Sequence, residues 1–174
     1  DVSIVMSVYN GMPFLTEAVE SILNQTYTDF EFLIINDGSK DNSFNVLKDY
    51  AEEDRRIKII NQENMGLTKS LNRAIALASG KYIVRQDADD ISVPNRLHEL
   101  QRNKNGSMIL ISLWGNMGDT GKKTNLFSAS LALFPAGMLR WLLGFGNLFV
   151  HGIYCMQKDA RSEERRVGKE CATG

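Results

Sequence analysis

Cysteine and histidine are scarce in this sequence, and charge of one sign does not dominate it. Its 174 residues include two histidines and two cysteines, and Cys155 and Cys171 lack the spacing of a metal site. A disulfide framework and a structural zinc domain are therefore excluded. So few cysteines are typical of a reducing compartment such as the cytoplasm.

Acidic and basic residues are nearly balanced, at 21 and 20, which gives a formal net charge of −1. Composition therefore gives no reason to expect nucleic acid as a partner. The chain opens on an apolar run, Val2–Val8, without the basic segment of a signal peptide. Because its first residue is Asp1 rather than Met, we expect a few residues to be missing in front of it.

The first hundred residues alternate between strand and helix patterns. Short apolar runs rich in β-branched residues predict strands at Val2–Val8, Phe30–Ile35, Ile57–Ile60 and Lys81–Arg85. Apolar residues at helical spacing predict a helix in each interval between them. This order predicts an α/β fold, Rossmann-like, with a mainly parallel sheet and helices on both faces.

The helical pattern also makes predictions about single residues. Pro13 suits the first turn of the first helix, and Phe14 and Leu67 fall on the buried faces of the first and third helices. Gly80 is well placed to end the third helix, and a further helix should begin after Pro94.

The later part of the chain carries weaker patterns. Residues 109–113 predict a strand, and residues 126–157 are markedly apolar. Because Pro135 and Arg140 interrupt this apolar stretch, we interpret it as a buried or interfacial segment rather than a membrane span.

Three carboxylates, Asp87, Asp89 and Asp90, occur within four residues where the fourth predicted strand ends. Ligands of open α/β sheets bind outside the carboxyl ends of the strands. Carboxylate oxygens are the ligands that Mg²⁺ and Mn²⁺ prefer, and these cations can in turn hold phosphates. The cluster therefore predicts an enzyme of phosphorylated substrates.

Polar groups also follow the first two predicted strands. Tyr9 and Asn10 follow the first strand, and Asp37 follows the second. An aromatic ring, a lone carboxylate and a metal-binding carboxylate suit a base, its ribose and a diphosphate. Asp37 in Asn-Asp-Gly-Ser fits a turn-forming residue equally well.

Several segments follow one another in a characteristic order and spacing: Val2–Asn10, Ser21–Tyr27, Ile35–Ser39, Asn64–Leu67 and Arg85–Asp90. Together they resemble the family 2 glycosyltransferases, inverting enzymes of the GT-A fold that use nucleotide-diphosphate sugars. The resemblance is strong over residues 1–100, the expected nucleotide-sugar-binding half of a domain spanning residues 1–160. It continues weakly over residues 140–151, where Leu148 stands in place of a usual proline.

The resemblance implies a donor site built from these segments. Tyr9 should lie against the base, with Asn10 and neighbouring backbone completing that wall, and Asp37 should accept a hydrogen bond from a uracil imide. Asp87 is expected near the ribose or the metal, and Ala88 belongs to the same nucleotide-sugar-binding set. Asp89 should bind the Mg²⁺ or Mn²⁺ that bridges the diphosphate.

Other residues keep two interpretations. Asp90 suits a metal ligand or a helix cap equally. Arg85 and Lys69 either pair with phosphate or with the carboxylates, or lie on a solvated face. His151 lies either near the donor or acceptor pocket or in a structural position.

The resemblance implies transfer of a sugar from a UDP-linked donor to a glycan, polysaccharide or lipid-linked acceptor. Such enzymes often work at the cytoplasmic face of a membrane, with peripheral contact. Inversion requires a general base, which in the family is a carboxylate well downstream of Asp-x-Asp.

The end of the sequence bears on that base. Residues 161–174 resemble a translated sequencing adapter, so we expect a non-native tail and a natural sequence cut off near Ala160, before the base. Asp159 lacks the expected surroundings. We therefore expect nucleotide binding without efficient transfer; the alternative is a nucleotide-sugar-binding module without transferase activity.

Overall fold

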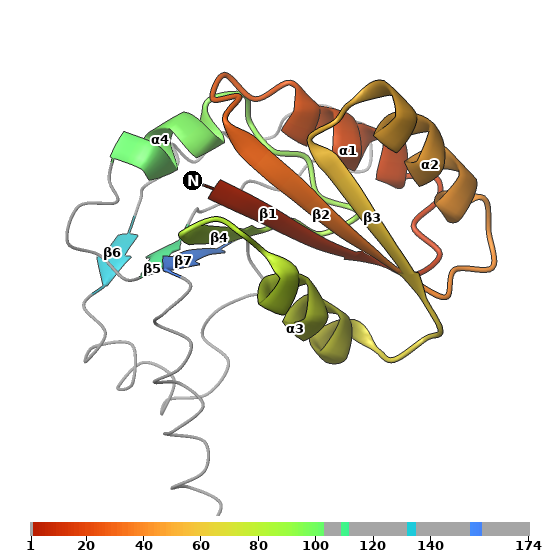
Figure 1. The fold of residues 1–174 in the computed structure, drawn as a ribbon. Coiled ribbons are helices and arrows are strands. Elements are labelled where there is room, and N and C mark those ends of the chain that lie inside the picture. The colour runs from red at the N-terminus through yellow and green to blue at the C-terminus, as the bar shows by residue number, and fades with distance from the viewer. Residues whose placement is uncertain (1, 103–108, 112–131, 135–153, 158–174) are drawn as a thin grey trace, which may run out of the picture.

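A single sheet organises the computed structural model, which describes residues 2–102, 109–111, 132–134 and 154–157 (Figure 1). Its strand order is β3-β2-β1-β4-β7-β5-β6. The strands β1 (Val2–Val8), β2 (Phe30–Asp37), β3 (Ile57–Gln62) and β4 (Tyr82–Arg85) pair in parallel. The order reverses at β1, because β2 and β3 lie on one side of it and β4 on the other.

The remaining strands extend the sheet in antiparallel fashion. β7 (Tyr154–Gln157) pairs with β4, β5 (Ile109–Ile111) pairs with β7, and β6 (Ala132–Phe134) pairs with β5. The strand predicted over 109–113 is thus confirmed at 109–111. β6 and β7 lie inside the apolar stretch 126–157, where the sequence pattern alone did not separate strand from other buried structure.

Helices cover both faces of the parallel part, as the alternating pattern predicts (Figure 1). One core joins the side chains of Ile4 and Met6 to α1 (Leu15–Leu23), α2 (Ser43–Glu53) and α4 (Arg96–Arg102). The other joins Val5 to α3 (Leu67–Leu77). Successive side chains of β1 therefore enter opposite cores, which is why apolar residues lie on both faces of this strand.

Two predicted core residues lie at the surface. Phe14 is 59% exposed because it precedes Leu15, the first residue of α1, and Pro13 likewise lies before the helix. Leu67 is 49% exposed because it is the first residue of α3, ahead of Ser70 and Leu71, where burial begins. The predicted helix after Pro94 is confirmed, since α4 begins at Arg96.

Gly80 does not cap α3, which ends at Leu77 with Ala78 as its C-cap. Instead its backbone passes against β1. The amide of Gly80 donates to Ser3 Oγ at 2.8 Å, and a Cβ on Gly80 would lie 2.7 Å from the backbone nitrogen of Ser3. A side chain is excluded here because there is no room for it.

Glu31 ties together the amino-terminal ends of the parallel strands. Its carboxylate accepts hydrogen bonds from Ser3 Oγ on β1, from the amide and hydroxyl of Ser79, and from Lys58 Nζ on β3. Burial alone would raise the pKa of Glu31, but the bonds from Lys58, Ser3 and Ser79 lower that pKa to about 2.

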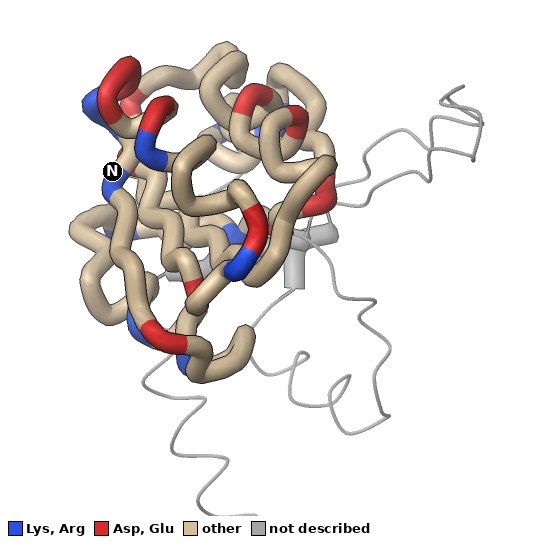
Figure 2. Tube along the Cα trace, turned by 90° about the vertical axis from the view of Figure 1, so that its right-hand side faces the viewer, with Lys and Arg blue, Asp and Glu red and all other residues tan. Residues whose placement is uncertain are grey.

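Lys and Arg positions are interspersed with Asp and Glu positions along the described chain (Figure 2). No helix in the described part of the chain is both long enough and apolar enough to cross a membrane. His151, Asp159 and the predicted tail, 161–174, lie outside the described residues, as does most of the apolar stretch.

Candidate functional site

The candidate site lies at the carboxyl ends of β1, β2 and β4, where the strand order reverses. In a parallel sheet these ends share one edge, and a reversal opens a crevice between the two connections that leave in opposite directions. β1 leads into Tyr9 and Asn10, β2 ends at Asp37, and β4 leads into the acidic segment that begins at Asp87. The three predicted groups are thus at the same sheet edge.

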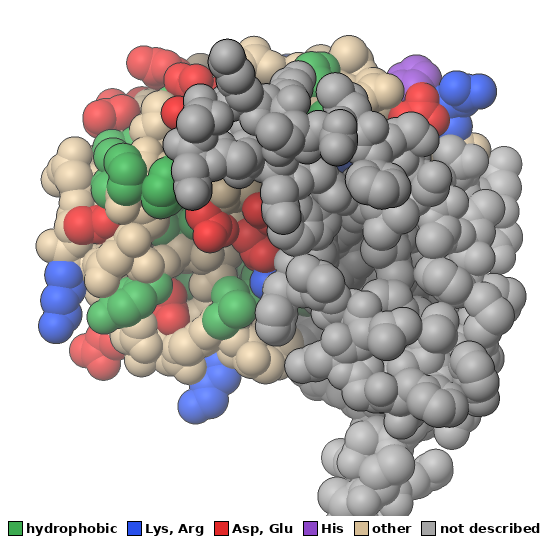
Figure 3. All heavy atoms as spheres, turned by 180° about the vertical axis from the view of Figure 1, so that it is seen from behind, with side chains coloured by type: hydrophobic (Ala, Val, Ile, Leu, Met, Phe, Trp, Pro, Cys, Tyr) green, Lys and Arg blue, Asp and Glu red, His purple; other side chains and the backbone are tan. Residues whose placement is uncertain are grey.

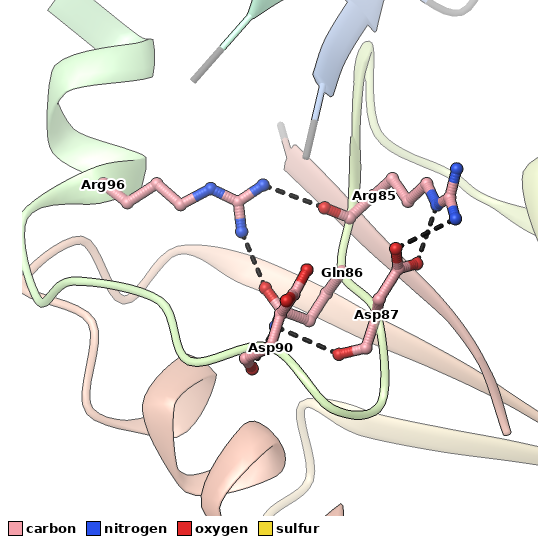
Figure 4. Close-up of polar contacts among 5 residues, drawn as sticks. All are labelled: Arg85, Gln86, Asp87, Asp90 and Arg96. Carbon is pink, nitrogen blue, oxygen red and sulfur yellow. Dashed lines mark hydrogen bonds and ion pairs between the residues drawn. The ribbon is translucent and has the colours of Figure 1, made fainter. Parts of the chain in front are cut away.

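The acidic segment is a tight turn directly after β4 (Figure 4). The amide of Asp90 donates to the carbonyl of Asp87 at 3.3 Å, with Ala88 and Asp89 at the tip. Arg85, the last residue of β4, binds the Asp87 carboxylate through two hydrogen bonds of 2.8 and 2.9 Å. Of the two predicted uses of Arg85, the structure shows pairing with a carboxylate. Asp89 is exposed.

Negative charge accumulates in this turn. Burial raises the pKa of Asp90, and the charges of Asp87 and Asp89 raise it further against the opposing effect of Arg96 and Arg85. A cation placed against Asp90 and Asp89 would relieve this repulsion. On the face seen in Figure 3, acidic side chains lie beside exposed hydrophobic ones.

The donor set fits a magnesium or manganese ion shared with a ligand. Within the described residues, no three acidic, histidine or cysteine side chains converge on one point, and Asp87 is already bound by Arg85. Mg²⁺ characteristically takes one or two protein carboxylates and completes its shell with water and substrate phosphates. Asp89 and Asp90 can supply those carboxylates.

Asp37 is buried, with 1% exposure, and its carboxylate is occupied inside the protein. Oδ1 accepts from the amide of Met65 at 2.8 Å and from Gln62 Nε2 at 2.7 Å, and Oδ2 accepts from the amide of Gly66 at 2.9 Å. Burial alone would raise the pKa of Asp37, but these bonds lower it. A carboxylate offers about four acceptor positions, so a further bond to a base remains a prediction.

These bonds fix the entry to α3. Gly66 is the residue before the helix. The Asp37 carboxylate, on β2, accepts from the amides of Met65 and Gly66, much as the side chain of an N-cap residue accepts from amides of its own helix. Gly38, next to Asp37, has φ of +75°, and a Cβ there would lie 2.8 Å from the nitrogen of Asn64. The turn after β2 therefore requires glycine at this position.

Two basic residues lie in the first two turns of α3. Lys69 is exposed on the first turn of the helix, and its predicted contact with phosphate stays a prediction. Arg73, one turn later, donates to Gln62 Oε1 at 2.7 Å, and Gln62 in turn binds Asp37. Sequence reasoning missed Arg73, although its spacing of four residues from Lys69 places both on one face of α3.

The loop after β1 is fastened to the loop after β2. The amide of Asn10 donates to Ser39 Oγ at 3.0 Å, and the amide of Lys40 donates to Asn10 Oδ1 at 2.8 Å. Asn10 has φ of 53°. Tyr9 beside it is 51% exposed, so its ring is available to lie against a ligand.

An open cavity of about 530 Å³ lies beyond the ends of β2 and β3. Its lining residues are Asn36, Gly38, Ser39, Lys40, Phe44, Asn61, Gln62, Glu63 and Asn64. Asn36 Oδ1 is buried and has no hydrogen-bond partner in the described structure. An acceptor left in this state suits an N–H or O–H group of a bound molecule. The sequence analysis did not predict a role for Asn36, because it assigned the role of this motif to the neighbouring Asp37.

This architecture defines a class of α/β proteins, those whose ligands bind at the carboxyl edge of a sheet at its reversal point. Residues 3–129 match the family model of glycosyl transferase family 2. The chain belongs to that family, as its motifs indicate.

Relatives of known sequence agree with this assignment. A glycosyltransferase of Haemophilus influenzae is 42% identical over 100 residues, which cover 57% of this chain and 31% of that protein. The glycosyltransferase GlyG of Streptococcus pneumoniae is 38% identical over 57% of this chain and 33% of its own length. The putative glycosyltransferase EpsH of Bacillus subtilis is 35% identical over 70% of this chain and 36% of its own. The chain thus spans about a third of the length of these relatives.

Solved structures share the fold. TarS 1–349 of Staphylococcus aureus, in complex with UDP, superposes with a TM-score of 0.63 at 24% identity, over 74% of this chain and 39% of that chain. The mannosyltransferase PcManGT of Pyrobaculum calidifontis, in complex with GDP-Man and Mn²⁺, gives 0.58 at 22% identity, over 81% and 46%. The predicted GT-A fold is confirmed.

Proposed function

We propose that this chain is the donor-binding part of a glycosyltransferase that takes a sugar from a nucleotide-diphosphate sugar, with UDP as the nucleotide, and uses Mg²⁺ or Mn²⁺. The observation that carries the proposal is the acidic Asp87–Asp90 turn at the reversal point of a parallel sheet. In support, TarS was solved with UDP and with UDP-GlcNAc, and PcManGT with GDP-Man and Mn²⁺.

The described residues divide the donor between two ends of the site. Asp89 and Asp90 would hold the cation, which would supply positive charge for the diphosphate. Asn36 Oδ1 and the cavity beyond β2 and β3 offer an acceptor for the base, beside Asp37, and Tyr9 provides an exposed ring at the end of β1. These groups follow different strands, the acceptor and cavity β2 and β3, the ring β1 and the carboxylates β4, which suits a ligand with an aromatic end and a charged end.

The chemistry follows from the leaving group. Departure of a nucleoside diphosphate develops negative charge, which a bound divalent cation stabilises. Asp89 and Asp90 fix its place, while Arg85 keeps Asp87 paired so that the turn does not carry three free charges. Transfer to a glycan or lipid-linked acceptor with inversion completes the proposal; the acceptor hydroxyl must then lose its proton to a base.

Calorimetric titration with UDP, with and without Mn²⁺, tests the donor site. We expect metal-dependent binding, weakened about tenfold or more by Asp89→Ala, which corresponds to about 1.4 kcal/mol or more. Asp49→Ala is the matched control, because Asp49 is an exposed residue of α2. A folded wild-type protein that binds no UDP in either condition would refute the proposal. Binding without sugar transfer would instead identify the chain as a binding module.

A further inference from the structure

The Asp87–Asp90 turn carries three carboxylates, of which Arg85 pairs that of Asp87, and the turn's own hydrogen bond is a long one, at 3.3 Å. Like charges so close together repel, and neither Ala88 nor the exposed Asp89 anchors the tip of the turn. The side chain of Gln86, the residue that precedes the turn, makes hydrogen bonds to it (Figure 4).

Gln86 is fully buried and grips both ends of the turn. Its Nε2 donates to the carbonyl of Asp87 at 3.2 Å and to the carbonyl of Asp90 at 2.6 Å. Its Oε1 accepts from Ser92 Oγ at 2.7 Å and from Arg96 Nη1 at 2.8 Å. Both donors and both acceptor positions of the amide are thus filled, which leaves the side chain a single orientation.

Arg96 holds Gln86 in that orientation. It is 4% exposed, at the start of α4, and its Nη1 also donates to Ser92 Oγ at 2.8 Å. Its Nη2 donates to the carbonyl of Arg85 at 2.8 Å, which fixes the end of β4 relative to α4. The planar guanidinium reaches these partners at once, which a lysine ammonium on a flexible stem does not reproduce.

A second buried glutamine secures α4 from the other side. Gln25, after α1, donates to the carbonyl of Val93 at 2.7 Å and accepts from the amide of Leu97 at 3.0 Å. The segment between the turn and α4 is therefore held at both ends. Because this segment cannot adjust, a displacement of Gln86 must also displace the turn.

We propose that Gln86 and Arg96 are positioning residues that hold the Asp87–Asp90 turn in the shape that presents Asp89 to a divalent cation. This inference rests on the proposed function for the identity of the cation. Partners that orient metal ligands typically change metal affinity about 10- to 100-fold when they are removed. Neither side chain itself binds the metal.

The test uses Gln86→Met and Arg96→Lys in the full chain, with Gln101→Met as the matched control. Gln101 lies on α4 and makes a hydrogen bond to Tyr27 Oη, away from the turn. We expect Gln86→Met and Arg96→Lys to weaken Mn²⁺ binding in the presence of UDP about tenfold or more, measured from free Mn²⁺ by electron paramagnetic resonance. Gln101→Met should leave it unchanged.

Amide hydrogen exchange without any ligand provides a second measurement. Exchange at Asp90 and Ser92 should accelerate in both variants and not in the control, because the turn loses its restraint. If wild-type protein binds no Mn²⁺ with UDP, the proposed function fails, and the exchange still decides whether Gln86 and Arg96 hold the turn. If a variant does not fold, Ser92→Ala removes one bond to Gln86 and should show both effects to a smaller degree. Folded variants with wild-type Mn²⁺ affinity would overturn the inference.

Discussion

Replacing Asp37 by asparagine tests how much the hydrogen bonds of its carboxylate contribute to the free energy of unfolding. The substitution keeps the shape of the side chain but leaves one acceptor oxygen where two now serve the amides of Met65 and Gly66. One of those amides would then face an NH₂ group, donor against donor. Hydrogen bonds to charged groups contribute about 1.5–3 kcal/mol, and a buried donor without a partner adds to that cost.

We therefore expect Asp37→Asn to lower the free energy of unfolding by about 2–4 kcal/mol. Small domains are stable by only about 5–15 kcal/mol, so the loss is a large fraction of the total. Urea denaturation followed by circular dichroism measures it as a lower midpoint with an unchanged slope. Asp49→Asn, on the exposed side of α2, is the control.

The pH dependence supplies an independent check. The pKa of Asp37 is lowered in the folded protein, so its contribution is present above the pKa of the unfolded chain and is lost as the pH falls through the folded pKa. The difference between wild type and Asp37→Asn should therefore shrink in acid. A change of less than about 0.5 kcal/mol at neutral pH, the range of ordinary surface substitutions, would refute the reasoning.

Three further predictions concern the scaffold. Glu31→Gln should lower the free energy of unfolding by up to about 3 kcal/mol at neutral pH, because the folded protein stabilises the charged form of Glu31. This difference should vanish as the pH falls from 4.5 towards 2. Chemical denaturation at several pH values, with Glu52→Gln as the control, measures it, and a pH-independent difference would contradict it. Gly80→Ala should cost about 1–3 kcal/mol by forcing backbone atoms of β1 and the loop apart, seen as a lower melting temperature; an unchanged melting temperature would show that the contact relaxes freely. Phe14→Ser should alter stability by less than about 0.5 kcal/mol, because the ring is exposed; a core-sized loss in the same melting experiment would restore the prediction made from helical spacing.

The parallel half of the fold was predictable because buried strands must be apolar. β1, β2 and β4 lie where the sequence predicts them, since both faces of each are covered. Helix ends were less predictable: at Phe14 and Leu67 the apolar spacing continues past the point where contact with the sheet stops.

Polar interiors were not predictable at all from periodicity. Gln86 and Arg96 lie in a sequence segment with the pattern of an acidic loop. Their burial depends on the contact between α4 and the end of β4. Glu31 likewise belongs to an apolar strand, and its partners come from three distant segments. The acidic turn itself was found from sequence because its charges are adjacent along the chain.

The fastening of the loop after β1 to the loop after β2 bears on how quickly and at what entropic cost a ligand is captured. Besides the Asn10 bonds, the amide of Gly11 donates to Ser43 Oγ at 2.9 Å and that of Met12 to Asp41 Oδ2 at 3.1 Å. Loops linked in this way lose little conformational entropy on binding, so the entropic cost is mainly the lost translational and rotational freedom of the ligand. Association at this end of the site should then be limited by diffusion and orientation rather than by a rearrangement of the protein.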